Sequence, residues 1–491
     1  MLAIAIVLGP IVNLALPFAG DQALFAVGAR HILGGEVLYR DFWDLKQPAV
    51  YWFFAAANVL FGRGPVPVHL LEGLWDALLA VSLAAAAKRW LPGRSAWLLL
   101  PLLGVTYAQV VTTSFDATQV EALAPLLLFL ALWAFVEALA SRRRALLLFC
   151  IAGAAASGAM LFKLLFAIVI FAMWAFAAGG AGKVAAHRTL RDICAIGAAL
   201  MSGMTIPLMA TAAYFATHGA LDRALTTWFV FPPEVVREIP HQSVRVFTDG
   251  VIAYVKNDAP LITLAALGVA GTLRSRNPLT SGAAGWIIGA VATIALQVTS
   301  WWSYQWQLLA IPTALLAVAG IPPLLAAVPR RKSALAAALA SMIVLYPVLH
   351  MRAKLLLLAH HGFGFTAAGR DAIQLATSPA LGRARDVASG LPAVSDRGLY
   401  VFGDPILYEV LGARQPVGIN GWAPELLTRR LRAELVDEMR STRPRLIFVD
   451  GAERKDFQLF LARSPDFWRF LKAAYEPKPA SHGRLYSARS P

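Results

Sequence analysis

The chain has 491 residues, of which 58% are hydrophobic and 15% are charged. So large an apolar share cannot be buried in soluble cores, which excludes an ordinary soluble enzyme and indicates a polytopic membrane protein. The formal net charge of +15 would suggest nucleic-acid binding in a soluble protein, but in a membrane protein the positions of the basic residues decide its meaning. The two cysteines, Cys150 and Cys194, lie in or beside apolar runs and indicate neither a disulfide framework nor a cysteine metal site.

Apolar stretches of about the 20 residues that a helix needs to cross a bilayer recur along the chain. The first resembles a secretory signal, but no basic segment precedes it and Pro10 interrupts it, so we expect an uncleaved span. A further apolar run, 49–61, is too short to span and is predicted to be a helix in the membrane interface. The eleven predicted spans are 2–19, 66–87, 95–113, 121–139, 145–161, 164–179, 193–215, 260–273, 281–299, 307–327 and 333–350.

Basic residues collect in every second loop, which predicts the orientation because cytoplasmic loops retain Lys and Arg. The loops near 88–94, 142–144, 183–191, 274–276 and 330–332 hold 14 basic residues and no acid. We therefore place them and the N-terminus in the cytoplasm, and the connections 20–65 and 217–258 outside. The positive charge is a signal of topology, which argues against nucleic acid as a partner and leaves the lipid bilayer.

The tail, residues 351–491, is richer in charge and is expected outside the cytoplasm, since it follows an odd number of spans. Its segments 399–403 and 444–450 are typical of buried strands, and 484–488 of a closing strand. Helical spacing occupies 404–411 and 424–439. We predict a small extracytoplasmic α/β domain at 351–491 beside a transmembrane module at 1–350. No glycine-rich phosphate loop follows either strand, so no nucleotide is assigned.

The first external loop carries a family resemblance. An Asp at its start, an Ala-rich helix ending in Gly-Gly, and the segment LYRDFWDLKQPAVYW at 38–52 resemble the opening of membrane glycosyltransferases of the GT-C superfamily. The pattern is similar to the family-39-like branch, which includes protein O-mannosyltransferases, lipid A aminoarabinose transferases and rhizobial lipopolysaccharide core glycosyltransferases. Segments 117–121, 158–163 and 304–312 fit the same branch, and the resemblance covers about the first 350 residues.

This resemblance implies a GT-C-like fold of about 11 transmembrane helices in the inner membrane of a bacterium. It implies a glycosyltransferase that moves a hexosyl or pentosyl group, with inversion, from a polyprenyl-phosphate sugar donor to an extracytoplasmic acceptor. That acceptor would be a cell-envelope glycan such as lipopolysaccharide, a lipid or a protein. Two positions depart from the pattern: Gln22 follows Asp21 where many relatives have a second acid, and Ser303 precedes Tyr304 where some have His. These departures leave the acceptor class and the metal dependence open.

Asp21 is the candidate general base. Transfer requires a base that deprotonates the acceptor hydroxyl, and a carboxylate in a partly dehydrated cleft is suited to this. Asp21 lies where the first span emerges, and the resemblance supports the role. The alternative is that Asp21 caps a helix beginning at Gln22.

The leaving phosphate needs cations, which are scarce near the membrane. Lys46, and Lys163 in an otherwise apolar stretch, are the candidates, followed by Arg40. As alternatives, Lys163 can snorkel to the interface and Arg40 can be a solvated loop residue. Asp41 and Asp44 are expected to pair with Arg40 and Lys46 or to lie in water.

Three acids are candidates for a divalent cation, since hard cations prefer oxygen ligands. They are Asp21, Asp116 and Glu121, and the last could instead orient the acceptor or be an ordinary loop-end acid. Tyr304 belongs to an aromatic cluster that forms either an interfacial belt or a substrate contact. His31 projects from nearly the opposite helix face to Asp21, which predicts a packed or solvated histidine and no Asp–His relay.

The second functional hypothesis is a transporter or flippase for a polyprenyl-linked or anionic solute. Transporters commonly contain two related halves and charges near the bilayer midplane. No internal repeat is evident here, and the charges gather at the outer boundary of the spans. The sequence therefore favours the glycosyltransferase.

Overall fold

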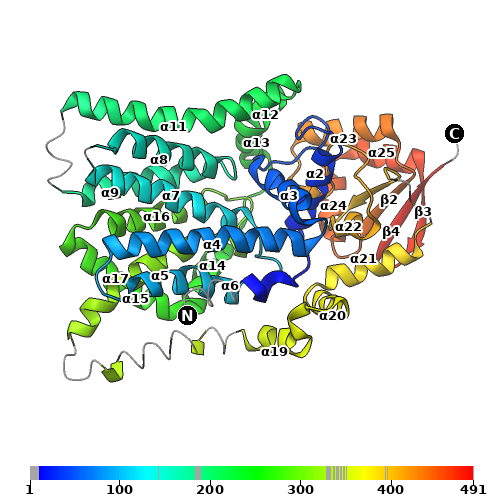
Figure 1. Cartoon of the computed structure of the whole chain (residues 1–491). Coiled ribbons are helices and arrows are strands. Elements are labelled where there is room, and N and C mark those ends of the chain that lie inside the picture. The colour runs from blue at the N-terminus through cyan, green and yellow to red at the C-terminus, as the bar shows by residue number, and fades with distance from the viewer. Residues whose placement is uncertain are drawn as a thin grey trace. The chain divides into compact units, whose positions relative to one another are not determined.

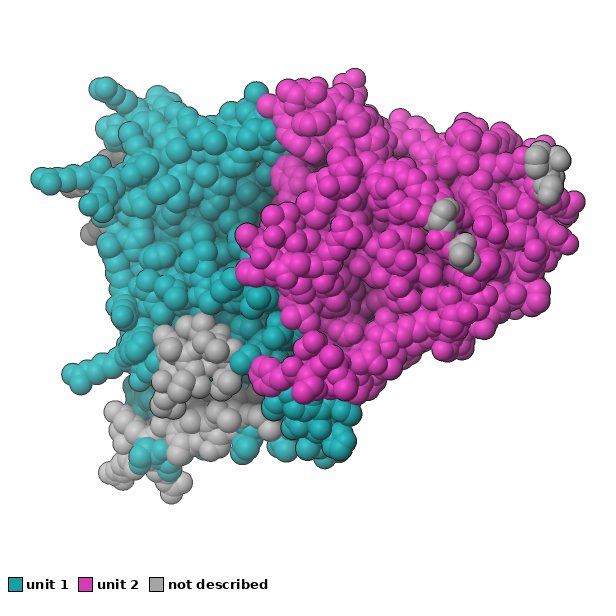
Figure 2. Space-filling model, turned by 45° about the vertical axis from the view of Figure 1, so that its right-hand side comes forward, with its two compact units in different colours: residues 1–14, 69–211, 242–363 teal, residues 15–68, 212–241, 364–491 magenta. Residues whose placement is uncertain are grey.

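The computed structural model describes residues 10–327 and 351–489, apart from 142, 183–188, 393 and 395, together with isolated positions between 333 and 349. The chain forms two compact units, each assembled from separate stretches of sequence (Figure 2). The first unit comprises 1–14, 69–211 and 242–363, and the second comprises 15–68, 212–241 and 364–491.

The first unit is helical (Figure 1). The helices that lie mainly in it are α4 (Pro65–Trp90), α5 (Ala96–Pro101), η1 (Leu102–Thr106), α6 (Tyr107–Val111), α7 (Val120–Ala140), α8 (Ala145–Met160), α9 (Phe166–Gly180), α11 (Leu190–Thr217), α14 (Val244–Asn257), α15 (Ala259–Ser275), α16 (Pro278–Ala295), η3 (Ser303–Leu309), α17 (Ala310–Ala327) and α19 (Arg352–His360).

Five described helices are long and apolar enough to cross a bilayer: Pro65–Trp90, Val120–Ala140, Leu190–Thr217, Pro278–Ala295 and Ser303–Ala326. Shorter apolar helices occupy Ala49–Phe61, Ala96–Val111, Ala145–Met160, Phe166–Gly180 and Ala259–Thr272. The prediction of a polytopic α-helical membrane protein is confirmed. The predicted spans 2–19 and 333–350, and the basic residues 142, 183, 188 and 330–332, lie wholly or partly outside the described residues.

Glycines allow helices of the first unit to approach closely. A Cβ atom on Gly268 of α15 would overlap the backbone of Leu316 in α17, and one on Gly320 of α17 would overlap the backbone of Leu264. In a membrane the hydrophobic effect does not drive helices together, because lipid tails are as apolar as the side chains. Small residues at a crossing let the two backbones approach and make van der Waals contacts instead. The close packing of α15 on α17 therefore requires glycine, which has no Cβ atom, at positions 268 and 320.

The second unit combines residues 15–68 and 212–241 with the tail from residue 364. Its helices are α2 (Asp21–Leu33), α3 (Ala49–Phe61), α12 (Leu221–Leu225), η2 (Thr226–Val230), α13 (Phe231–Glu238), η5 (Gly362–Gly364, at the unit boundary), α20 (Ala367–Thr377), α21 (Pro379–Gly390), α22 (Ile406–Leu411), η6 (Pro424–Leu426), α23 (Arg429–Thr442), α24 (Arg454–Arg463) and α25 (Pro465–Ala474). The connection 217–258, which the sequence presents as a loop, is thus largely helical. Pro232 and Pro233 stand in the first turn of α13, where a missing N–H costs little.

The tail contains a four-stranded sheet in the order β1-β2-β4-β3. Its strands are β1 (Leu399–Phe402), β2 (Leu446–Asp450), β3 (Tyr475–Ala480) and β4 (Gly483–Ala488). β1 and β2 are parallel, and β4 runs antiparallel to β2 and β3. The predicted strands and the small α/β fold are confirmed. β3 was not predicted because Pro477 and Pro479 argue against a strand, but an edge strand tolerates proline.

Candidate active site

Asp21 is the first residue of α2, and Gly20 occupies the N-cap position with φ 54°. The helix therefore begins one residue earlier than the capping alternative required. Lys46 Nζ donates a hydrogen bond to Oδ2 of the Asp21 carboxylate, and Trp422 Nε1 donates one to Oδ1 at 2.8 Å. The side chains of Asp21 and Lys46 are 16% and 22% exposed. The candidate base and one candidate phosphate ligand thus form an ion pair that solvent still reaches.

The loop that carries Lys46 is ordered by its own hydrogen bonds. Tyr39, which has φ 72°, donates from its hydroxyl to the carbonyl of Lys46 at 2.8 Å. Trp228 donates in turn to the Tyr39 hydroxyl at 2.8 Å. Lys46 Nζ also lies 4.8 Å from the centroid of the Phe25 ring, a cation–π distance. These contacts hold the lysine beside Asp21 before any substrate binds.

Other polar residues of this loop have structural partners. Arg40, 46% exposed, pairs with Asp41 at 2.7 Å and donates to the His218 carbonyl at 2.7 Å. The predicted pairing of Asp41 with Arg40 is confirmed. Asp44 instead accepts a hydrogen bond from Tyr51 at 2.5 Å, and burial raises the pKa of its carboxyl group.

His31 is a packed histidine, as predicted. It is buried, its Nδ1 lies 2.6 Å from Glu36 Oε2, and its ring stacks on Phe42 with centroids 5.1 Å apart. No contact joins it to Asp21 among the interactions that the structure describes.

In the first unit, Lys163 and Glu121 form an ion pair. Lys163 lies in the turn between α8 and α9, and its Nζ is 2.7 Å from Oε1 of Glu121 in the first turn of α7. The Glu121 side chain is 1% exposed and that of Lys163 is 18% exposed. Because the partner carboxylate is buried, Lys163 is not simply a snorkelling lysine.

Asp116 and Tyr304 are far apart in the sequence, but their segments contact each other in the first unit. Asp116 accepts hydrogen bonds from Thr113 at 2.6 Å and from Ser303 at 3.4 Å, so Ser303 contacts a candidate acid. Tyr304 is buried in η3, and its ring lies 5.7 Å from that of Phe115. It does not line the cavity described next, whereas its neighbours Trp306 and Gln307 do.

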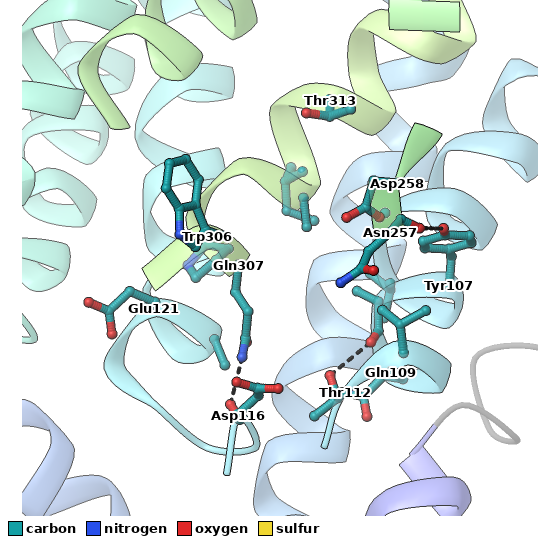
Figure 3. Close-up of a pocket in the computed structure, with 18 of the residues that line it drawn as sticks. Tyr107, Gln109, Thr112, Asp116, Glu121, Asn257, Asp258, Trp306, Gln307 and Thr313 are labelled. Atoms are coloured by element: carbon teal, nitrogen blue, oxygen red, sulfur yellow. Dashed lines mark hydrogen bonds between the residues drawn. The ribbon is translucent and has the colours of Figure 1, made fainter. Parts of the chain in front are cut away.

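The first unit contains a cavity of about 240 Å³ (Figure 3). Its described lining includes no Lys, Arg or His. In Figure 3 Gln307 reaches Asp116, whose backbone oxygen it bonds at 2.8 Å, and Asn257 and Asp258 lie near Tyr107. Burial raises the pKa of Asp258 to about 6. The polar lining consists of Glu72, Asp76, Tyr107, Gln109, Thr112, Asp116, Glu121, Tyr254, Asn257, Asp258, Ser303, Trp306, Gln307 and Thr313.

Sequence reasoning missed the polar residues on α4. Glu72 accepts a hydrogen bond from the Thr118 hydroxyl at 2.9 Å, and Asp76 accepts one from Gln109. Two acids within the apolar stretch 66–87 were the available signal, since ionisable residues inside a membrane span are by default functional. Lys354, which donates to Asn13 at 2.7 Å, had no such signal.

No metal site is assembled among the described residues: no group of three or more His, Cys, Asp and Glu side chains is placed to hold an ion. Asp116 and Glu121 are engaged separately, by hydroxyl groups and by Lys163 respectively. Any cation shared with Asp21 stays a hypothesis.

The sequence matches the family described as dolichyl-phosphate-mannose-protein mannosyltransferase over residues 46–206. Among curated proteins, none matches the sequence. Among solved structures, ArnT from Cupriavidus metallidurans bound to undecaprenyl phosphate is similar at a TM-score of 0.59 and 16% identity, covering 99% of this chain and 96% of that one. AglB from Archaeoglobus fulgidus, in complex with an inhibitory peptide and a dolichol-phosphate, is similar at a TM-score of 0.52 and 11% identity, covering 100% and 74%.

These comparisons confirm the resemblance to GT-C glycosyltransferases and the GT-C fold. At such low identities the solved structures establish the fold alone. The family match begins at Lys46 and also includes three other candidate residues, Asp116, Glu121 and Lys163.

Proposed function

We propose that this protein is an integral-membrane glycosyltransferase that moves a sugar from a polyprenyl-phosphate donor to an extracytoplasmic acceptor. The observation that carries the proposal is the solvent-accessible pair of Asp21 and Lys46, a carboxylate and an ammonium group within one short motif. The fold likeness supports it: the ArnT and AglB structures contain undecaprenyl phosphate and a dolichol-phosphate, both polyprenyl-type lipid phosphates.

Asp21 is proposed to act as the general base. Its carboxylate takes the proton from the acceptor hydroxyl, whose oxygen forms a bond to the anomeric carbon of the donor. The bond from that carbon to the phosphate oxygen breaks at the same time, and polyprenyl phosphate leaves with the electron pair. Attack from the face opposite the leaving group inverts the configuration.

The lysines are proposed to bind the donor phosphate. Lys46 Nζ donates a hydrogen bond to Asp21 in the structure. Because an ammonium group has three donors, it can also donate to a phosphate oxygen, or exchange its bond to Asp21 for one to the phosphate. Lys163 would supply the second charge, and Glu121 would hold it or orient the acceptor. Arg40 and Tyr304 are weaker candidates for substrate binding, because their side chains already have structural contacts.

The cavity of the first unit is proposed to receive a sugar. Carboxylates accept hydrogen bonds from sugar hydroxyls, amides both accept and donate them, and Trp306 is an aromatic residue of the same lining. A phosphate would be disfavoured there, because the described lining contains five carboxylates and no basic side chain.

The decisive experiment uses purified protein in nanodiscs with labelled polyprenyl-phosphate sugars, and it measures release of polyprenyl phosphate. We expect Asp21→Asn to reduce transfer by a factor of about 10² to 10⁴, the range that general base catalysis contributes. Asp466→Asn, which removes an exposed surface carboxylate, is the matched control. Full activity of Asp21→Asn would refute Asp21 as the general base. Uptake of a solute without cleavage of the donor would instead support a transporter. Adding EDTA tests whether a divalent cation is required.

A further inference from the structure

The tail supplies one of the two hydrogen-bond donors to Asp21 described above. Trp422, between α22 and η6, donates from Nε1 to Oδ1 at 2.8 Å, while Lys46 occupies Oδ2. A carboxylate has about four acceptor sites, so these two donors fix its orientation and still leave room for a proton. Both Asp21 and Trp422 belong to the second compact unit, although 401 positions separate them in sequence.

The backbone around Trp422 is held on two sides. The Gly421 carbonyl accepts a hydrogen bond from Gly403 N at 3.1 Å, next to the end of β1, and the two segments form a bridge. On the other side Asn420 donates to the Trp43 carbonyl at 3.0 Å, in the first loop. Asn420 also accepts from the Trp422 backbone N–H at 3.1 Å. The indole is therefore placed by the tail sheet and by the loop that carries Lys46.

A second contact ties the tail to the start of α2. The carboxylate of Asp404, which follows β1, accepts a hydrogen bond from the backbone N–H of Gly20, the residue before Asp21. Gly20 has positive φ, a conformation that glycine adopts at no steric cost. The tail thus holds both the backbone and the side chain of the candidate base.

We propose that Trp422 is the positioning residue of the reaction, holding the Asp21 carboxylate oriented and ionised when the donor phosphate draws Lys46 away. This rests on the proposed function, in which Asp21 is the base and Lys46 a phosphate ligand. Without Trp422, a Lys46 that moves to the phosphate leaves the carboxylate without either of these two donors. Hydrogen bonds to the ionised form favour that form, so the indole keeps the base active at lower pH.

The test is Trp422→Phe, which keeps an aromatic ring and removes the N–H. In kcat, which reports the donor-bound enzyme, we expect the acid limb of the pH profile to move up by about one pH unit, as loss of one hydrogen bond to a charged group predicts. In kcat/KM, which reports the free enzyme, Lys46 still holds Asp21 and the shift should be smaller. Trp468→Phe, in α25, is the matched control and should leave both profiles unchanged.

Other titratable groups near Asp21 are Lys46 and Asp44 on the loop, Tyr51 on α3, and Asp404 through Gly20. Burial raises the pKa of Asp404 to about 6, so its titration could produce an acid limb of its own. Asp404→Asn keeps an acceptor for Gly20 and abolishes that titration. The Trp422→Phe shift should persist in the Asp404→Asn background; its disappearance there would overturn the proposal.

If the Trp422→Phe variant does not fold, NMR of the Trp422 indole N–H tests the hydrogen bond without an activity assay. In the ¹⁵N-labelled wild type, the Trp422 indole signal, assigned from the wild-type spectra, should move when Asp21 is changed to Asn. An unmoved signal would show that the hydrogen bond is absent and would overturn the proposal. An inactive Asp21→Asn together with an unshifted Trp422→Phe profile would refute the role of Trp422 alone, whereas an active Asp21→Asn would refute the proposed base itself.

Discussion

At the scale of single residues, two of the candidate charges, Lys163 and Glu121, form an ion pair. In the sequence Lys163 is alone in an apolar stretch and Glu121 opens a span; in the structure Lys163 Nζ lies 2.7 Å from Glu121 Oε1. A buried carboxylate needs a partner, since an unpaired buried charge is costly. The pair therefore has a structural role in addition to any role in binding the donor, and variants must separate the two.

Lys163→Met should lower both stability and transfer. Removing the partner of the buried Glu121 should cost about 3 kcal/mol of unfolding free energy, and the KM for the donor should rise because a phosphate ligand is lost. Thermal melting and donor-dependent kinetics in nanodiscs measure the two effects.

The double variant Lys163→Met with Glu121→Gln separates these effects. It removes the unpaired charge, so stability should largely return, while transfer should stay below that of Glu121→Gln alone, which controls for any role of Glu121 in orienting the acceptor. Recovery of transfer together with stability would mean that Lys163 serves only as the partner of Glu121.

At the scale of elements, side-chain size at helix crossings matters more than hydropathy. Periodicity and length predict where the apolar helices lie, but the contact of α15 with α17 depends on two glycines that carry no sequence signal of their own. In a membrane the hydrophobic effect does not drive helix association, so these close van der Waals contacts stabilise the helix pair instead. The crossing should therefore be intolerant of a single added methyl group.

Gly268→Ala should destabilise the protein by about 1–3 kcal/mol, the usual cost of overpacking, because its Cβ would overlap the Leu316 backbone. Gly271→Ala, one turn along the same helix, is the control: its Cβ would meet only Pro323 at 4.0 Å. There the better helix propensity of alanine should be neutral or stabilising. Equal melting temperatures for the two variants would contradict the close-packing argument.

At the scale of the whole molecule, the charge pattern predicts which side of the membrane each segment faces. In a background with Cys150 and Cys194 changed to alanine, a cysteine at Lys478 in the tail should react with a membrane-impermeant maleimide on intact cells. A cysteine at Arg94, in a basic loop, should react only after the cells are permeabilised. Both positions are exposed, so access to solvent does not distinguish them. The opposite pattern of labelling would invert the topology.

The sequence by itself determined the class of the protein, because lipid solvation, helix length and charge bias are local properties of a segment. It also predicted Asp21, Lys46, Lys163 and Glu121 as candidates, since charges near a membrane are few enough to examine one by one. Three of the four strands of the tail sheet, β1, β2 and β4, were equally evident from alternation and length, while the proline-containing edge strand β3 was not.

Only the tertiary structure decided which of these residues meet. The ion pairs of Asp21 with Lys46 and of Glu121 with Lys163 depend on how helices and turns pack, which no local pattern encodes. Glu72 and Asp76 are visible in the sequence as acids within an apolar stretch, but only the structure shows that they line the same cavity. Trp422 is the clearest case: it reaches Asp21 because a segment of the tail bridges β1 and the first loop, a contact between residues 401 positions apart.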